Sequence, residues 1–213
     1  MMEIAQPLRI AQVLRIAPVV PVLTIADAKS ARGIAEALVA GGLPVLEVTL
    51  RTPCALDALA EMTRVPGAIV GAGTVLDPAQ IEGARAAGAR FLVSPGLTER
   101  VALAARAAAL PLLPGVATAS EIMRGLELGF DHFKFFPAEA SGGPAVLRAM
   151  AGPFPNCRFC PTGGIRPDNA GAWLSLPQVL CVGGTWLVPS GASDLAAIER
   201  RARDAAAIRG SLT

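Results

Sequence analysis

Residues 19–50 read VVPVLTIADAKSARGIAEALVAGGLPVLEVTL, and this stretch contains two β-rich runs separated by a helical one. Residues 19–25 and 44–50 are rich in Val, Leu and Ile, whereas residues 28–40 place apolar side chains at helical spacing. A buried strand, a helix and a second buried strand in this order are typical of a βαβ unit with parallel strands.

The same alternation continues to the end of the chain. We predict eight strands, at residues 19–25, 44–50, 68–75, 89–94, 112–117, 132–136, 158–162 and 179–185. Predicted helices follow the strands, for example at residues 28–40, 78–87, 98–109, 118–128 and 193–207. Helix-start residues precede some of them, namely Asp77-Pro78, Thr118 with Glu121, and Asp194. Glycines stand where helices should end, at Gly41, Gly88 and Gly129.

Eight βα units of about 22 residues each are enough to close a (β/α)8 barrel, the TIM-barrel fold of the α/β class. A doubly wound open sheet is the alternative. No linker or low-complexity segment interrupts the series, so we predict a single domain over residues 1–213. Within it, residues 1–17 would hold an extra N-terminal helix and residues 18–213 the barrel.

The composition argues against several classes of protein. Of 213 residues, 53% are hydrophobic and 17% charged, which provides a sizeable core and little material for disorder. A net charge of +2 without Lys or Arg clusters indicates neither nucleic acid nor a membrane as a partner. The mean hydropathy is +0.51, yet charged residues, Gly or Pro interrupt every apolar run before the roughly 18 residues of a membrane span. Residues 4–16 read as an amphipathic helix rather than a signal peptide.

The four cysteines, Cys54, Cys157, Cys160 and Cys181, are too few to staple a chain of this size, which favours a reducing, cytoplasmic setting. Residues 157–160 match the Cys-x-x-Cys pattern. However, they lie in a predicted strand, where residues three apart point to opposite faces. Isolated thiols that behave as small hydrophobes are therefore favoured over a zinc or redox pair.

One charged residue, Lys134, interrupts the apolar run 133–137, which reads FKFFP. Burial disfavours the ammonium form and lowers the pKa of a lysine, so the neutral amine can attack a carbonyl near neutral pH. This is the chemistry of a Schiff-base enzyme. Two structural alternatives remain open from this strand alone: a lysine that reaches out to the strand end, or one half of a buried ion pair.

Strand alternation brings further charges to the same interior, because alternate residues of a barrel strand point inward and active sites lie at the carboxyl ends of the strands. The helix-facing residues would be Leu46, Val48 and Leu50 on the second strand and Phe133 and Phe135 on the sixth. Glu47, Thr49, Arg51 and Lys134 then point inward. A buried structural ion cluster is the alternative. The surplus of positive charge favours a site for an anionic substrate.

Glycine pairs close the last two predicted strands, in Thr162-Gly163-Gly164 and Gly183-Gly184-Thr185. Such pairs often mark only tight turns, but the loops after strands 7 and 8 are the usual phosphate site of this fold. Residues 71–74, GAGT, lack a nucleotide-binding motif. Thr74 is better placed to donate its hydroxyl to a bound carboxylate.

His132 is the only histidine and stands at the entry end of its strand, where we expect a hydrogen-bonded polar residue at the bottom of the barrel. A single histidine without a paired cysteine motif argues against a histidine-based metal site. Composition leaves an all-carboxylate magnesium site open. We predict metal-free chemistry.

With these residues in place, the chain resembles the class I 2-keto-3-deoxy-6-phosphogluconate (KDPG) aldolases, which also act as 4-hydroxy-2-oxoglutarate (KHG) aldolases. The resemblance covers nearly the whole chain. It is carried by residues 45–52 (VLEVTLRT), 71–75 (GAGTV), 94–97 (SPGL), 133–139 (FKFFPAE) and 158–165 (RFCPTGGI).

The resemblance implies a role for each matching residue. Lys134 would form the Schiff base and Glu47 would be the general acid and base. The substrate-binding residues would be Arg51, Thr74 and the backbone near Pro95 for the pyruvyl carboxylate, Phe135 for the pocket wall, and Thr162, Gly163, Gly164, Gly184 and Thr185 for the phosphate end. The role of Phe135 conflicts with the strand alternation above. Thr185 stands where the family pattern has serine, and it keeps the hydroxyl but adds a methyl group.

The implied reaction is the reversible cleavage of a phosphorylated 2-keto-3-deoxy sugar acid to pyruvate and glyceraldehyde 3-phosphate. It needs no cofactor beyond the covalent lysine imine, and the family forms homotrimers. Three alternatives remain: the galactonate epimer as substrate, a phosphate-binding isomerase or synthase that uses Lys134 only as an acid, and a non-enzymatic scaffold.

Overall fold

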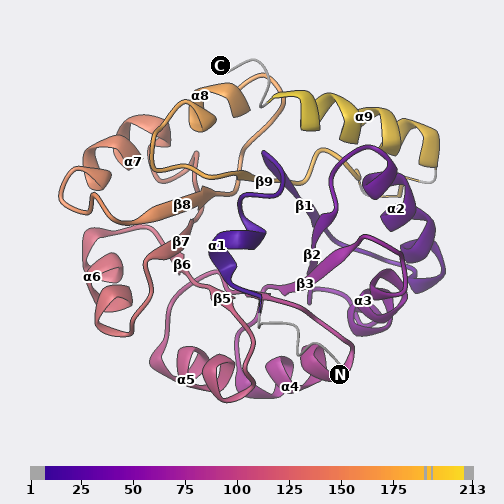
Figure 1. Ribbon diagram of the computed structural model, residues 1–213, viewed down its shortest axis with the longest axis horizontal. Coiled ribbons are helices and arrows are strands. Elements are labelled where there is room, and N and C mark those ends of the chain that lie inside the picture. Colours follow the sequence, from indigo (N-terminus) through magenta and orange to yellow (C-terminus); the bar gives the residue numbers. More distant parts are fainter. Residues whose placement is uncertain (1–7, 190, 193, 209–213) are drawn as a thin grey trace, which may run out of the picture.

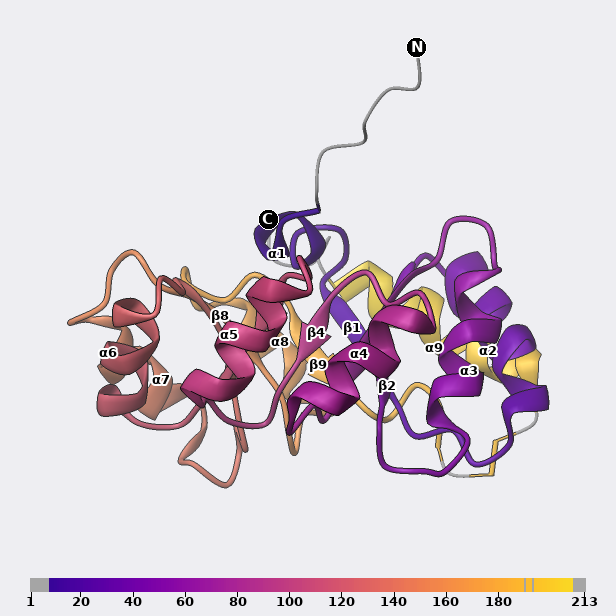
Figure 2. The ribbon, with the colours of Figure 1, turned by 90° about the horizontal axis from the view of Figure 1, so that it is seen from below.

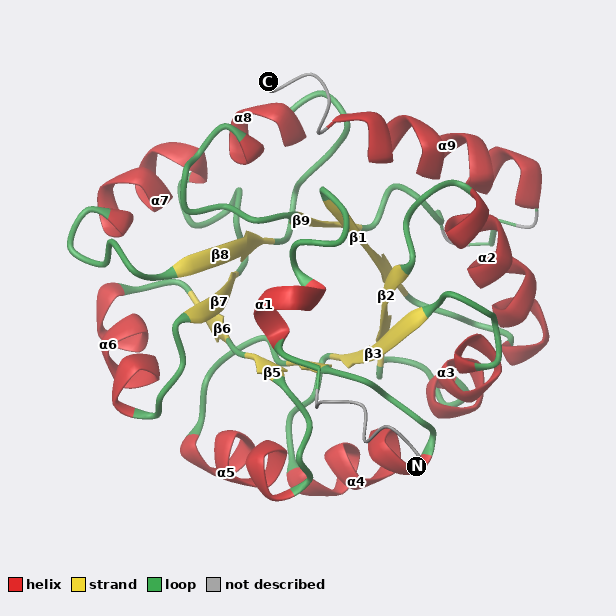
Figure 3. Ribbon diagram, viewed as in Figure 1, coloured by secondary structure: helices red, strands yellow, loops and turns green. Residues whose placement is uncertain are grey.

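The computed structural model describes residues 8–189, 191–192 and 194–208, and its strands form a ring with most helices outside it (Figures 1 and 3). The strands are β1 (Val19–Leu23), β2 (Val45–Thr49), β3 (Ile69–Gly73), β4 (Leu92–Val93), β5 (Leu112–Leu113), β6 (Gly115–Val116), β7 (His132–Phe135), β8 (Arg158–Pro161) and β9 (Val182–Gly184). Each of the eight predicted strands contains at least one of them. The prediction of an α/β fold with parallel strands is therefore confirmed.

Helices follow most strands, as the alternating sequence pattern predicts. They are α1 (Ile10–Val13), α2 (Ala28–Ala40), α3 (Ala55–Thr63), α4 (Pro78–Ala86), α5 (Glu99–Ala107), α6 (Ala119–Glu127), α7 (Gly143–Ala151), α8 (Ala170–Leu174) and α9 (Leu195–Ala207). Side-chain caps hold several starts: Thr118 and Glu121 form a capping box on α6, and Asp77 accepts from the backbone of Gln80 on α4. Helix α2 ends at Gly41 as predicted, but the left-handed residue is Gly42, with φ 91°.

The strands pair in two parallel sheets. One sheet has the order β5-β4-β3-β2-β1-β9 and the other the order β6-β7-β8. The predicted fifth strand is broken at Pro114, so its first half, β5, pairs with β4 and its second half, β6, pairs with β7. A bridge between Thr162 and Gly183 links the end of β8 to β9.

Alternation along the strands divides the buried side chains into two clusters. Leu46 and Val48 of β2 and Phe133 and Phe135 of β7 belong to the large cluster that contains the buried faces of the outer helices. The smaller cluster holds the alternate strand residues together with two residues near α1: Val13, Leu14, Val20, Val45, Phe91, Val93, Leu113, Cys160, Leu180 and Cys181. The predicted inward and outward faces of β2 and β7 agree with this division.

The two residues of the Cys-x-x-Cys pattern lie in different clusters, Cys157 in the outer one and Cys160 in the inner one. Both thiols are free, and burial raises the pKa of Cys157. The prediction that they point to opposite faces is confirmed. Among the described residues, no helix is long and apolar enough to cross a membrane.

The N-terminal helix is much shorter than the segment 4–16 that the sequence indicates. Residues 4–7 lie outside the described residues, and α1 ends at Val13. The next amides, of Arg15 and Ile16, bond to carbonyls only three residues back, which tightens and ends the helix. The helix lies across one end of the ring of strands (Figures 2 and 3). There Val13 and Leu14 are buried in the inner cluster, next to the first residues of the strands.

We expect Leu14→Ala to lower the free energy of unfolding by about 3 kcal/mol, because it leaves a cavity in the inner cluster. Leu14 is 2% exposed, whereas Ile16, two residues later, is 41% exposed. Ile16→Ala is therefore the matched control, with an expected loss below about 1 kcal/mol. Urea unfolding followed by tryptophan fluorescence measures both. Equal losses would contradict the packing role of α1.

Candidate active site

The centre of the site is an ion pair between Lys134 of β7 and Glu47 of β2. The lysine Nζ lies 3.1 Å from Glu47 Oε1, and the two side chains are only 6% and 4% exposed. They are 87 residues apart in sequence. The Nζ also lies 5.2 Å from the centre of the Phe136 ring. The structure thus brings together the two charges that strand alternation turned inward.

The Glu47 carboxylate occupies space that a side chain on β3 would fill. A Cβ added to Gly73 would lie 2.3 Å from Glu47 Oε1, which is far inside van der Waals contact. Gly73 is paired in register with Thr49, two residues after the glutamate. The glycine therefore fixes where the carboxylate can lie. The sequence signalled residues 71–74 only as a glycine-rich run.

Arg51 and Thr74 meet at the carboxyl ends of β2 and β3. Arg51 Nε donates a hydrogen bond of 3.1 Å to Thr74 Oγ1. Thr74 has a φ of 60°, a left-handed conformation that is unusual outside glycine and is typical of functional sites. The guanidinium is exposed, so its other N–H groups are available to a planar anion such as a carboxylate.

Neighbouring Thr49 has a structural role between strands. It points inward as predicted and is buried, but its hydroxyl donates to the Leu23 carbonyl and bonds with Thr24 Oγ1, each at 2.9 Å. These bonds tie β2 to the end of β1.

A pocket of about 170 Å³ opens beside the ion pair. Its lining is shared by several strand ends and consists of Val22, Arg51, Lys134, Phe136, Thr162, Gly163, Gly164, Ile165, Gly183 and Thr185. Six of the eleven predicted site residues are among them. The predicted carboxylate end and phosphate end of the substrate therefore border one cavity, with Lys134 between its walls.

Other predicted residues lie outside this lining. Glu47 and Thr74 contact lining residues, as described above. The carbonyl of Pro95 packs against Gly115 of β6, which is paired in register with Lys134. Gly184 makes room for Trp186, because a Cβ there would lie 2.1 Å from the indole ring.

Phe135 requires a correction. Its side chain is fully buried in the outer cluster and its ring centre lies 6.0 Å from that of Trp173 in α8, so it does not line the pocket. Phe136 lines the pocket instead. Strand alternation indicated this arrangement, since the residue two after the inward-facing Lys134 faces inward as well. The residue carried over from the family pattern was displaced by one position.

The glycine pair after β8 adopts backbone conformations that other residues rarely reach. Gly163 and Gly164 have φ values of 101° and 77°. On the neighbouring strand, a Cβ at Gly183 would lie 2.3 Å from Thr162 Oγ1, so this glycine makes room for the buried threonine. Backbone amides of such a loop can approach an anion closely.

Across the described part of the chain, no group of three or more His, Cys, Asp and Glu side chains is close enough to hold an ion. His132, at the start of β7, bonds through Nδ1 to Asp131 Oδ1 at 2.6 Å. The expected position of His132 at the other end of its strand, as a hydrogen-bonded polar residue, is confirmed.

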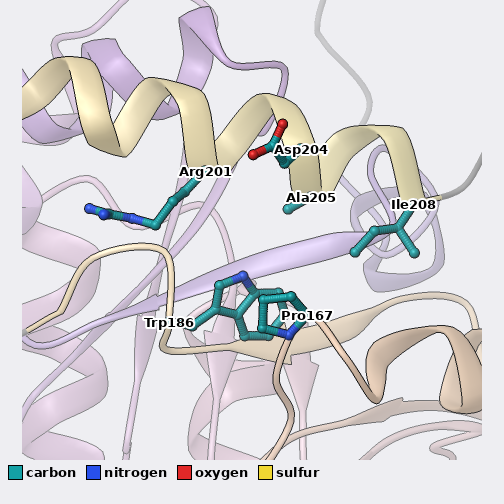
Figure 4. Close-up of a pocket in the computed structure, with 6 residues that line it drawn as sticks. All are labelled: Pro167, Trp186, Arg201, Asp204, Ala205 and Ile208. Atoms are coloured by element: carbon teal, nitrogen blue, oxygen red, sulfur yellow. The ribbon is translucent and has the colours of Figure 1, made fainter.

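A second pocket, of about 200 Å³, lies between α9 and the segments before α8 and after β9 (Figure 4). Its lining residues are Pro167, Trp186, Arg201, Asp204, Ala205 and Ile208. Pro167 and Trp186 line the side opposite α9 (Figure 4). None of the predicted site residues lines it, so the pocket beside Lys134 is the candidate active site.

A family model for KDPG and KHG aldolases matches residues 10–201. This chain belongs to that family. A 2-dehydro-3-deoxy-phosphogluconate aldolase of Zymomonas mobilis is 56% identical over 192 residues, which cover 90% of this chain and 92% of the relative. A KHG/KDPG aldolase of Escherichia coli is 54% identical, covering 88% and 90% of the two chains. The resemblance stated from the sequence is confirmed.

Solved structures of family members share the fold. The KDPG aldolase of Zymomonas mobilis with 3-phosphoglycerate is 56% identical, with a TM-score of 0.91 over 93% of this chain and 95% of that one. The KDPG aldolase of Legionella pneumophila, with pyruvate captured as a covalent carbinolamine, is 47% identical, with a TM-score of 0.89 over 92% and 97%. A carbinolamine is an amine adduct of a carbonyl, so that family member uses Schiff-base chemistry.

We expect Gly73→Ala to lower kcat/KM for aldol cleavage by about 100-fold, because the added methyl group displaces the Glu47 carboxylate. Gly171→Ala in α8 is the matched control, since a Cβ there meets nothing within 4 Å. Circular dichroism verifies that both variants fold. If Gly73→Ala turned over at the parent rate, the position of Glu47 would not matter for catalysis.

Proposed function

We propose that this chain is a class I aldolase that cleaves 2-keto-3-deoxy-6-phosphogluconate to pyruvate and glyceraldehyde 3-phosphate. The observation that carries the proposal is the buried contact of 3.1 Å between Lys134 Nζ and Glu47 Oε1 beside the pocket. An amine held next to a carboxylate in a water-poor pocket can form an imine and move protons to and from it. The names of the relatives in Zymomonas and Escherichia support the choice of substrate.

The reaction begins with proton transfer from Lys134 to Glu47 across their hydrogen bond. The neutral amine adds to the C2 ketone, and loss of water gives an iminium ion. Glu47, returned to the carboxylate form, takes the C4 hydroxyl proton as the C3–C4 bond breaks, and the bonding electrons move into the iminium to form an enamine. The aldehyde leaves. Glu47 then protonates C3 of the enamine, and water hydrolyses the new imine to release pyruvate.

The ends of the substrate would be held by different kinds of group. Arg51, supported by Thr74 and the backbone near Pro95, would bind the carboxylate, for which the guanidinium offers a bidentate fork. The amides of Gly163 and Gly164 and the hydroxyl of Thr185 would bind the phosphate, with Thr162 and Gly184 shaping that end of the pocket. Phe136 would form the wall between them.

KHG, cleaved to pyruvate and glyoxylate, is the second proposed substrate, because the Escherichia coli relative carries both names. The galactonate epimer of KDPG is a weaker alternative: the matching structure named KDPGal is only 25% identical, with a TM-score of 0.84. A thiamine phosphate pyrophosphorylase of Pyrococcus furiosus, at 20% identity and a TM-score of 0.70, shares the fold alone.

Further parts of the proposal concern the whole molecule. We propose that the ring is a closed (β/α)8 barrel, which counts β5 and β6 as one strand and is supported by the bridge between Thr162 and Gly183. We also propose that the chain forms a single domain and that catalysis needs no metal. The protein would be a cytoplasmic homotrimer. Exposed apolar side chains such as Leu103, Met123 and Leu126 would find cover in an oligomer.

Reduction with borohydride in the presence of pyruvate tests imine formation. The chain contains two lysines, Lys29 and Lys134. Lys29 is exposed on α2, so Lys29→Arg leaves a chain with one candidate amine side chain. We expect this variant to gain one reduced pyruvyl group on Lys134, located by peptide mass spectrometry, and Lys134→Arg to gain none. Cleavage of KDPG without such an adduct would contradict the Schiff-base mechanism. Absence of both the adduct and cleavage would favour the isomerase, synthase or scaffold alternatives.

We expect Arg51→Lys to raise KM for KDPG by roughly tenfold with a smaller change in kcat, because an ammonium cannot copy the bidentate fork. Arg32→Lys, on the exposed face of α2, is the matched control and should leave both constants unchanged. Steady-state kinetics with a coupled dehydrogenase measure the effect. An unchanged KM for Arg51→Lys would remove this residue from carboxylate binding.

A further inference from the structure

The turn after β7 holds a carboxylate that the proposed reaction does not use. Glu139 is half-buried and lies outside the pocket lining. Its Oε1 accepts a hydrogen bond of 2.7 Å from Trp173 Nε1 and one of 3.3 Å from Asn169 Nδ2. Both donors come from α8 or its N-cap. Two hydrogen-bond donors therefore hold this partly buried carboxylate in a defined position, unlike the exposed glutamates of the outer helices.

The same residue is in direct contact with the glycine pair. The backbone N–H of Glu139 donates to the Gly163 carbonyl at 3.1 Å. A Cβ added to Gly164 would lie 2.6 Å from Glu139 Cβ, so the glutamate side chain packs closely against this glycine. Asn169 Nδ2 also donates to the Gly164 carbonyl at 3.1 Å. Glu139 and Asn169 therefore hold both glycines without entering the cavity.

Such support matters because Gly163 and Gly164 have the widest conformational freedom of any residue type. Glycine reaches their left-handed φ values without steric cost, so contacts with neighbours select these conformations among many. Amides bind an anion best when they are oriented in advance. The Asn169 amide supplies this orientation to Gly164 from behind the loop, and the Glu139 carboxylate holds that amide in place.

Trp173 connects Glu139 to β7, the strand that carries Lys134. Trp173, the first donor to Glu139, is fully buried and lies against Phe135 with ring centres 6.0 Å apart. Phe135 follows Lys134 in β7. The glycine loop is thus held at a fixed place relative to the lysine amine.

We propose that Glu139 is a positioning residue that shapes the phosphate-binding loop and so sets the preference for phosphorylated over unphosphorylated substrates. The inference rests on the proposed aldolase function. In this proposal Glu139 affects only the binding of the phosphate end of the substrate. Loss of the carboxylate then weakens phosphate binding and leaves imine formation intact.

Two measurements on Glu139→Ala separate these effects. We expect KM for KDPG and the inhibition constant of inorganic phosphate each to rise by roughly tenfold. We expect the exchange of pyruvate methyl protons with deuterated water, followed by proton NMR, to stay within about twofold of the parent, since it needs the imine but no phosphate. Glu82→Ala, which removes an exposed glutamate of α4, is the matched control and should change neither.

Conservative variants distinguish positioning from folding and from simple charge. Glu139→Gln keeps an oxygen that can accept from Trp173 Nε1, so KM for KDPG should stay within about threefold of the parent. Trp173→Phe keeps the ring but removes the N–H, and it should reproduce the selective rise in KM. If Glu139→Ala does not fold, Trp173→Phe still tests the proposal.

Each outcome decides the matter. A selective rise in KM and in the phosphate inhibition constant supports the positioning role. Unchanged KM in Glu139→Ala and Trp173→Phe overturns it, as does an equal loss of pyruvate exchange, which would indicate a general structural effect. A parent protein that neither exchanges pyruvate protons nor cleaves KDPG would refute the aldolase proposal itself, and this inference with it.

Discussion

The buried ion pair of Lys134 and Glu47 is the constraint on which the rest of the structure depends. Removing two charges from water is costly, and their attraction offsets that cost only when the geometry is good. The strands β2 and β7 must therefore hold the two atoms at 3.1 Å. Gly73 keeps the carboxylate in place by having no side chain. The pair is also chemically useful for this reason, because a fixed amine and carboxylate need no rearrangement before they react.

Two apolar layers provide this rigidity, and they do so from opposite directions. Phe133 and Phe135 pack β7 against the helices. Because side chains alternate along a strand, Lys134 then points into the ring. From within the ring, α1 covers one end (Figure 2), and Leu14 beside it is packed in the inner cluster. Only the carboxyl end of the strands is then left for the pocket. The division into a packed end and a reactive end follows from period-two alternation together with one short helix.

Strand alternation made the central pair predictable, because the face of each residue is a local property while the ring brings distant strands together. Lys134 and Glu47 could be placed in one interior although 87 residues separate them. Features outside regular strands were missed. Pro114 breaks the predicted fifth strand, and Glu139 lies in a turn without any periodicity. Their roles come from tertiary contacts, which a pattern in one sequence does not contain.

The two ends of the pocket differ in how well the sequence indicates which groups would bind the substrate there. At one end the proposed carboxylate ligand is a charged side chain, Arg51, whose residue type alone indicates an anion. At the other end the proposed phosphate ligands are backbone amides of Gly163 and Gly164, whose positions depend on the packing behind them.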